Sequence, residues 1–96
     1  MIKDINIIIP LRDEDEQAEI TVRLLSEELK DLKKKFVITL IDDYSSDATW
    51  NLLNKLKEKY SNVEIFKNGY DAGYGNAVRF AIEKNKCDSV VFFMGD

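Results

Sequence analysis

Three acidic clusters stand behind apolar stretches of the chain, where their side chains could hold a cation or a polar ligand. Asp13-Glu14 comes shortly after the stretch that ends at Pro10, Asp42-Asp43 ends a second stretch, and Asp96 follows a third. In α/β proteins, ligands bind beyond the carboxyl ends of the strands. These clusters therefore predict a binding crevice along one edge of a sheet.

Each acidic cluster also has a purely structural explanation. Asp13-Glu14 would complement the positive end of a helix dipole without any ligand. Asp42-Asp43 is harder to explain in this way, because adjacent carboxylates at the end of a buried strand repel each other and lose hydration. This pair needs hydrogen-bond donors or a cation in compensation. A role of Asp43 as a turn or cap residue stays open at this point.

A glycine-containing segment, 68–76, could approach an anionic ligand. Gly73-Tyr74-Gly75 precedes a predicted helix, where backbone N–H groups can contact a group such as a diphosphate. A loop that only needs a positive φ would explain the same glycines. Arg79, one turn into that helix, could contact a phosphate or pair with Glu83 four residues on.

The composition excludes several kinds of site. The chain has 96 residues, which allow one domain, and a formal net charge of −4. It has no histidine and one cysteine, which excludes His-based catalysis, an internal disulfide and a multi-cysteine zinc site. A metal would therefore be bound by oxygen ligands, which favours Mg²⁺ or Mn²⁺. The lysines gather at predicted helix ends, not on a face with interleaved aromatics, so we expect no nucleic-acid binding.

The sequence also bears on location. No apolar run approaches the length of a transmembrane helix. The first residues, Met1 to Asp4, lack the apolar core of a signal peptide, so we expect a cytoplasmic protein. A longer parent protein at the cytoplasmic face of a membrane fits the same observation.

The periodicity of apolar residues predicts the elements that must position these side chains. Apolar, β-branched runs predict strands at 5–10, 36–41, 63–66 and 89–94. Apolar residues spaced by three and four predict helices over 15–35, over a segment from Trp50 to Tyr60, and over 75–85. Ser45-Ser46-Asp47 is expected to cap the second helix. The order βαβαβαβ favours the α/β class, with a parallel sheet and helices on both faces.

Four segments together resemble the inverting family 2 glycosyltransferases, which have the Rossmann-like GT-A fold. Residues 7–14 are similar to the family's opening strand, and residues 40–49 to its pattern of two Asp, Gly-Ser and Asp-x-Thr. Residues 68–79 are similar to its Gly-x-Gly-x-Ala segment, and 90–96 to the strand leading into its metal-binding Asp-x-Asp. The order and spacing agree over nearly the whole chain. Among subgroups, the polyprenyl- or dolichyl-phosphate hexose synthases are the most similar.

The resemblance implies a site for a nucleotide-sugar, UDP- or GDP-hexose. The residues that it assigns to this site are Pro10, Leu11, Arg12, Glu14, Asp42, Asp43, Gly73, Gly75 and Arg79. Within this set, Asp43 would accept a hydrogen bond from the base, while the first loop would line the base and ribose pocket. Asp96 would bind a Mg²⁺ or Mn²⁺ ion that bridges the two phosphates. An acceptor, a polyprenyl phosphate or a glycan, would attack the anomeric carbon with inversion.

The chain departs from the family pattern at three positions. Tyr44 replaces the usual glycine, which predicts a different backbone conformation in the turn after Asp43. Arg12 stands where an aromatic residue is common. Asp96 is either the last acid of the metal motif, whose first acid is then missing, or the first acid, with its partner beyond residue 96.

The family's acceptor site and catalytic base belong to its later half. We therefore expect domain 1–96 to be a nucleotide-sugar-binding half, truncated at the metal-binding motif, with the base beyond residue 96. Such a chain would not turn over alone, and an uncovered sheet edge would favour a homodimer.

Other function classes fit part of the pattern. A phosphoacceptor signalling domain also has an acidic Mg²⁺ pocket at its strand ends, but the paired aspartates here follow the second strand, not the first. A non-catalytic α/β module for protein contacts is the other alternative. A nucleotidyltransferase lacks support, because no glycine-rich loop follows the first strand.

Overall fold

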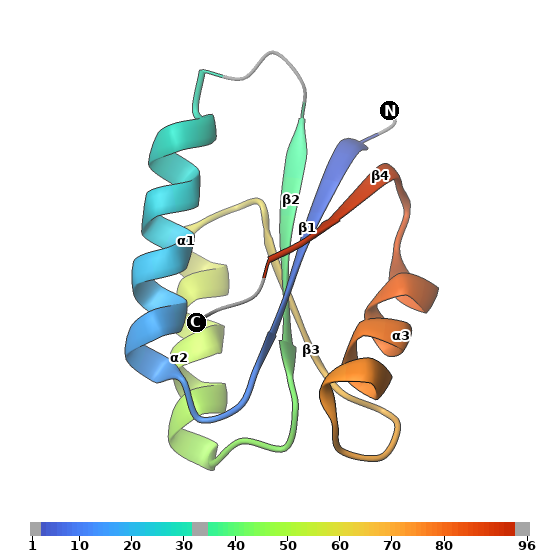
Figure 1. Cartoon of the computed structure of the whole chain (residues 1–96). Helices are drawn as coiled ribbons and strands as arrows, with labels where there is room; N and C mark the ends of the chain where they lie inside the picture. The colour runs from blue at the N-terminus through green and yellow to red at the C-terminus, as the bar shows by residue number, and fades with distance from the viewer. Residues whose placement is uncertain (1–2, 32–34, 94–96) are drawn as a thin grey trace.

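The computed structural model describes residues 3–31 and 35–93, which form one parallel sheet with helices on both faces (Figure 1). In chain order the elements are β1 (Lys3–Leu11), α1 (Asp15–Leu29), β2 (Phe36–Asp42), α2 (Asp47–Lys59), β3 (Val63–Lys67), α3 (Tyr74–Lys84) and β4 (Cys87–Phe92). The predicted α/β class and the order βαβαβαβ are both confirmed. None of the described helices is long and apolar enough to cross a membrane.

The strand order is β3-β2-β1-β4, so the direction of the chain across the sheet reverses at β1. The register pairs Ile7 with Ile38 in β2 and with Val91 in β4, all parallel. Because the strands are parallel, the loops after β1, β2 and β3 all leave at the same edge of the sheet. This topology brings the candidate loops together.

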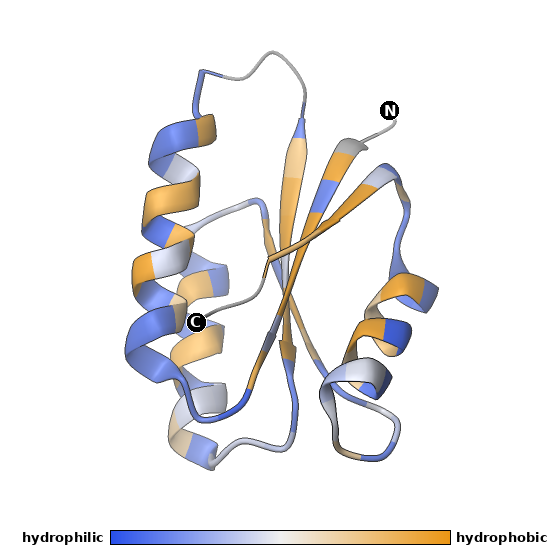
Figure 2. Cartoon of the chain, viewed as in Figure 1, coloured by the Kyte–Doolittle hydropathy of each residue, from blue (hydrophilic) through white to orange (hydrophobic). Residues whose placement is uncertain are grey.

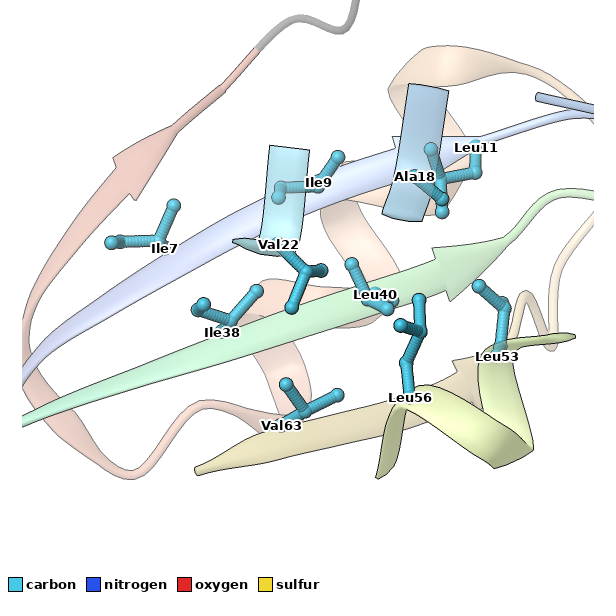
Figure 3. Close-up of a cluster of buried hydrophobic side chains, with 10 residues drawn as sticks. All are labelled: Ile7, Ile9, Leu11, Ala18, Val22, Ile38, Leu40, Leu53, Leu56 and Val63. Carbon is cyan, nitrogen blue, oxygen red and sulfur yellow. The ribbon is translucent and has the colours of Figure 1, made fainter. Parts of the chain in front are cut away.

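The larger part of the core lies between the sheet and the pair α1 and α2 (Figure 3). Alternate residues of β1 and β2, Ile7, Ile9, Ile38 and Leu40, point into this layer together with Val22 of α1. The residues between them face α3, where Ile8 and Ile41 pack on two alanines of that helix. Both faces of these strands are therefore buried, which explains why they read as continuous apolar runs. The hydropathy colouring in Figure 2 shows these apolar strands ending in hydrophilic loops.

Several details differ from the sequence-based expectation, among them the bounds of the first strand, which runs over Lys3–Leu11 and not over 5–10. Helix α1 ends at Leu29, not at Lys35, because the Lys35 carbonyl already accepts a hydrogen bond from the Ile5 N–H as the chain enters β2. Strand β4 begins earlier than predicted, at Cys87. Ser46 is the N-cap residue of α2, but its side chain makes no capping hydrogen bond.

Candidate functional site

The candidate site lies where the loops after β1, β2 and β3 meet at the carboxyl edge of the sheet (Figure 1). These loops comprise residues 12–14, 43–46 and 68–73. They contain the acidic and glycine segments singled out from the sequence. The middle loop lies between the other two, because β2 lies between β1 and β3 in the sheet.

Asp43 links the loop after β2 to the loop after β3. Its side chain is buried, with 6% of its surface exposed. The backbone N–H of Gly73 donates to both carboxylate oxygens, at 3.1 Å each, and the Asn68 side-chain amide donates to one of them at 3.0 Å. These donors compensate the carboxylate for its lost hydration. The N–H of Gly73 thus contacts Asp43 directly, and a φ of 134° explains why this position is glycine.

Asp42 also finds donors within the protein. Its carboxylate accepts a hydrogen bond from the Ser45 N–H at 3.0 Å, and its carbonyl accepts one from the Asn68 N–H at 2.9 Å. With 3% of its surface exposed, its carboxylate belongs to the turn and not to an open cavity. Hydrogen-bond donors of the protein therefore compensate both carboxylates, and Asp42 also stabilises the turn after β2. Of the two carboxylates, that of Asp43 is the one bonded to the glycine loop.

The loop after β1 is fastened to the loop after β2 by a reciprocal pair of hydrogen bonds. The Asp13 N–H donates to the Ser45 hydroxyl at 2.7 Å, and the Ser46 N–H donates to the Asp13 carboxylate at 2.8 Å. Asp13 has a φ of 53°, a left-handed conformation that aspartate tolerates better than most residues. One turn further on, the buried Thr49 hydroxyl donates to the Asp15 carboxylate.

These hydrogen bonds give a structural role to polar residues that the resemblance did not assign to the nucleotide-sugar site. Asp13, Ser45 and Thr49 hold the loops together. Asp13 belongs to one of the acidic clusters that predicted the crevice, but none of the three was among the residues assigned to the nucleotide-sugar. The signal available in the sequence was the preference of Asp and Ser for turns. That preference does not tell which distant turn is the partner.

The remaining candidates of the first loop occupy different environments. Arg12 is exposed, and its backbone N–H lies 3.4 Å from the Glu14 carboxylate that it donates to. Pro10 and Glu14 are partly buried. Leu11, by contrast, has its side chain in the core between the sheet and α1, and only its carbonyl takes part at the edge, accepting the Asp43 N–H at 2.8 Å.

Tyr44 lies in the left-handed region of backbone conformation, which glycine enters more easily than other residues. Its φ is 63°, and its hydroxyl donates to the Tyr70 carbonyl at 2.6 Å. This bond ties the second loop to the third at another point. The side chain is nonetheless mostly exposed, at 56%.

Arg79, on α3, contacts a carboxylate of its own helix and an aromatic ring of the loop after β3. Its Nε lies 3.5 Å from the Glu83 carboxylate, which confirms the predicted pairing, and its guanidinium lies 4.7 Å from the centre of the Tyr70 ring. The Tyr70 hydroxyl donates to the same Glu83. This hydrogen bond is the main reason why the pKa of Tyr70 is raised above its ordinary value.

The other glycines have separate roles. A side chain at Gly69 would clash with the Phe80 ring, whose nearest atom would lie 2.6 Å from a Cβ, so this glycine permits a close approach that the sequence did not reveal. Gly75 lies in the first turn of α3, and a Cβ there would meet nothing within 4 Å.

Two of the hollows on the described surface bear on the location of the site. One, of about 360 Å³, lies at the carboxyl edge and is lined by Tyr44, Gly69, Tyr70, Asp71, Asn76 and Arg79. The other, of about 650 Å³, lies toward the amino ends of the strands, and Asn6, Val37 and Cys87 are among its lining residues. The smaller hollow is the one that adjoins the candidate loops. Asp96, the predicted metal ligand, lies outside the described residues.

The sequence matches the profile of "Glycosyl transferase family 2" over residues 6–96. The chain belongs to the family 2 glycosyltransferases. A search of curated protein sequences found no significant match to this glycosyltransferase chain. Among solved structures, its fold is similar to a mannosyltransferase from Pyrobaculum calidifontis in complex with GDP-mannose and Mn²⁺, with a TM-score of 0.83 and 17% sequence identity. That match covers all of this chain and 28% of the mannosyltransferase, so the chain spans little more than a quarter of that protein's length.

Proposed function

We propose that this chain is the donor-binding half of a glycosyltransferase that moves a hexose from a nucleotide-sugar, UDP- or GDP-hexose, to an acceptor hydroxyl or a lipid phosphate, with inversion. One observation carries the proposal: Asp43, buried at the end of β2, binds the N–H of Gly73 and so joins the family's two-Asp and glycine segments into one edge site. Family membership and the GDP-mannose bound to the similar fold support it. The same support disfavours a phosphoacceptor domain.

The residues of the site would have different roles in binding the nucleotide. The bonds to Gly73 and Asn68 hold Asp43 in place, so that its remaining lone pairs are available to an N–H of the base. Arg12 and Glu14 stand on the neighbouring loop, which the Asp13 contacts hold beside it. This preorganisation reduces the entropy cost of ordering the loops when a nucleotide binds.

A divalent metal would supply charge neutralisation for the leaving diphosphate. Within residues 3–31 and 35–93, no group of three His, Cys, Asp or Glu side chains could hold such an ion. Two of the described carboxylates at the edge, those of Asp42 and Asp43, are instead bonded to protein N–H groups. The metal proposal therefore rests on Asp96 and on the Mn²⁺ of the similar structure. We assign no acceptor group and no catalytic base to the described residues.

Titration followed by two-dimensional NMR tests donor binding. We expect UDP, GDP or their hexose conjugates, with Mg²⁺, to shift amide signals around Asp43, Gly73 and Gly75. Asp43→Asn should weaken these shifts, whereas the matched control Asp88→Asn, at an exposed position of β4, should leave them unchanged. A well-dispersed spectrum that no nucleotide shifts would contradict the proposal.

Mn²⁺ tests the metal separately. As a paramagnetic ion it should broaden signals near its site, and Asp96→Asn should abolish this broadening while nucleotide shifts at Asp43 persist. Broadening that survives Asp96→Asn would place the metal elsewhere.

We also propose self-association through β4. Among the described strands it forms one edge of the sheet, and its end exposes Val91, Phe92 and Phe93, at 49%, 44% and 38%. Exposed apolar edge strands favour pairing with another chain. Light scattering should detect a dimer that Phe92→Lys converts to monomer; a wild-type monomer at high concentration would contradict it.

A further inference from the structure

Tyr44 has a backbone conformation that costs free energy, and the packing of its ring does not offset that cost. A φ of 63° belongs to the left-handed region, which a residue with a bulky side chain enters at a cost and a glycine enters freely. The ring is not buried in compensation, since 56% of the side chain is exposed. Its hydrogen bond to the Tyr70 carbonyl is solvent-exposed. Backbone strain that is not offset by burial of the side chain is typical of functional sites.

We propose that the ring of Tyr44 is the stacking platform for the nucleobase of the donor, and hence a residue that sets nucleotide affinity. The inference rests on the proposed function and assigns the 360 Å³ hollow as the subsite for the base and its ribose. A volume of this size falls within the range of small-molecule pockets, about 300–1,000 Å³.

Tyr44 is the aromatic residue of the described loops that is available for such a contact. The loop after β1 contains no ring between residues 12 and 14. The Tyr70 ring is already covered, by the Arg79 guanidinium at 4.7 Å and by an edge contact with Phe80 at 5.7 Å. No ring or cation contact of this kind involves Tyr44 within the described part of the chain, so its ring can accept a flat ligand.

Asp43 does not line the hollow itself, but the Asn68 side-chain amide donates both to the Asp43 carboxylate and to the carbonyl of Asp71, which does line it. Tyr44 follows Asp43 directly in the chain, and the hydroxyl bond to the Tyr70 carbonyl restricts where the Tyr44 ring can lie. Asn76 and Arg79 line the same hollow, and their side chains carry N–H donors for ribose or phosphate oxygens. The Arg79 side chain is 65% exposed and its ion pair with Glu83 uses Nε, so the outer N–H groups of the guanidinium are accessible.

The stacking role can be tested without destroying the fold. Tyr44→Gly removes the ring and places at φ 63° the residue that adopts this conformation most easily. Tyr44→Phe keeps the ring and removes only the hydroxyl. By calorimetric titration with GDP and UDP, we expect Tyr44→Gly to raise Kd about tenfold, within the usual effect of losing a base–aromatic stack. Tyr44→Phe should stay within about twofold of the wild type, because stacking does not need the hydroxyl.

The outcomes separate this inference from the proposed function. If the wild type binds nucleotide and Tyr44→Gly binds equally well, the stacking role is wrong while the donor site stands. If Tyr44→Phe loses as much affinity as Tyr44→Gly, the hydroxyl bond matters and not the ring, which also overturns it. Should the wild type bind neither nucleotide, both proposals fail for this chain, since all residues invoked for the stack are present.

Discussion

Replacing Gly73 and Gly75 by alanine, one at a time, should change the free energy of unfolding in opposite directions. Gly73 has φ 134° and ψ 149°, a region that is essentially restricted to glycine. Gly75 lies in the first turn of α3. A Cβ at either position would meet no atom within 4 Å, so steric clashes cannot account for a difference between them. Replacing each by alanine therefore compares the backbone conformation alone.

The magnitudes follow from the two conformations. Gly73→Ala should destabilise the fold by about 1–3 kcal/mol, the usual cost of holding a residue in such a region. Relaxation of the backbone would relieve this strain only by breaking the two N–H contacts to Asp43. Gly75→Ala should stabilise the fold by about 0.5–1 kcal/mol, because alanine favours the helix and restricts the unfolded chain. The two variants should thus differ by roughly 1.5–4 kcal/mol in the free energy of unfolding.

Urea unfolding followed by circular dichroism measures this difference. For a domain of this size, 1 kcal/mol corresponds to about 4–8 °C in Tm, so thermal unfolding offers an independent check. Amide shifts of Asp43 and Asn68 should move in Gly73→Ala and stay unchanged in Gly75→Ala. Equal stability of the two variants would refute the reasoning, because it would mean that the Gly73 conformation imposes no requirement for glycine.

Three further outcomes follow from the described contacts. The pKa of Tyr70 is raised chiefly by the hydrogen bond to Glu83, so the folded state favours the neutral form of this tyrosine. The stability that this hydrogen bond contributes is therefore present below about pH 10, the pKa of an unfolded tyrosine, and is lost as the pH rises through the raised pKa. Phenolate absorbance should show one late-titrating tyrosine that Glu83→Gln returns to the ordinary range; no late tyrosine in the wild type would contradict this. Asp13→Ala should cost about 1–2 kcal/mol by placing alanine at φ 53° and removing the acceptor for Ser46, whereas Asp13→Asn should largely retain the wild-type urea midpoint. Leu53→Ala, at a position with no exposed surface, should cost about 2–5 kcal/mol in the same assay; a loss well below that range would mean that the site collapses around the cavity.

Several features of the site were open to sequence reasoning because they depend on neighbours along the chain. The Arg79–Glu83 pair is an example, since residues four apart in a helix lie side by side whatever the rest of the fold does. The end of α1 was not predictable in the same way. The sequence of residues 30–35 contains no glycine or proline, and the helix stops because the chain must reach β2 in register with Ile5. A tertiary requirement of this kind overrides local helix propensity.

The sequence by itself determined the alternation of strands and helices, the burial of β1 and β2 on both faces, and membership of the glycosyltransferase family. Periodicity and motif spacing carry this information, because burial imposes one pattern on a strand and another on a helix. Only the tertiary structure decided which polar groups compensate Asp43, a carboxylate that binds an N–H thirty residues away. Donor and acceptor meet there because parallel pairing places β2 beside β3, and the energy of a hydrogen bond depends on a distance and an angle that no single segment specifies.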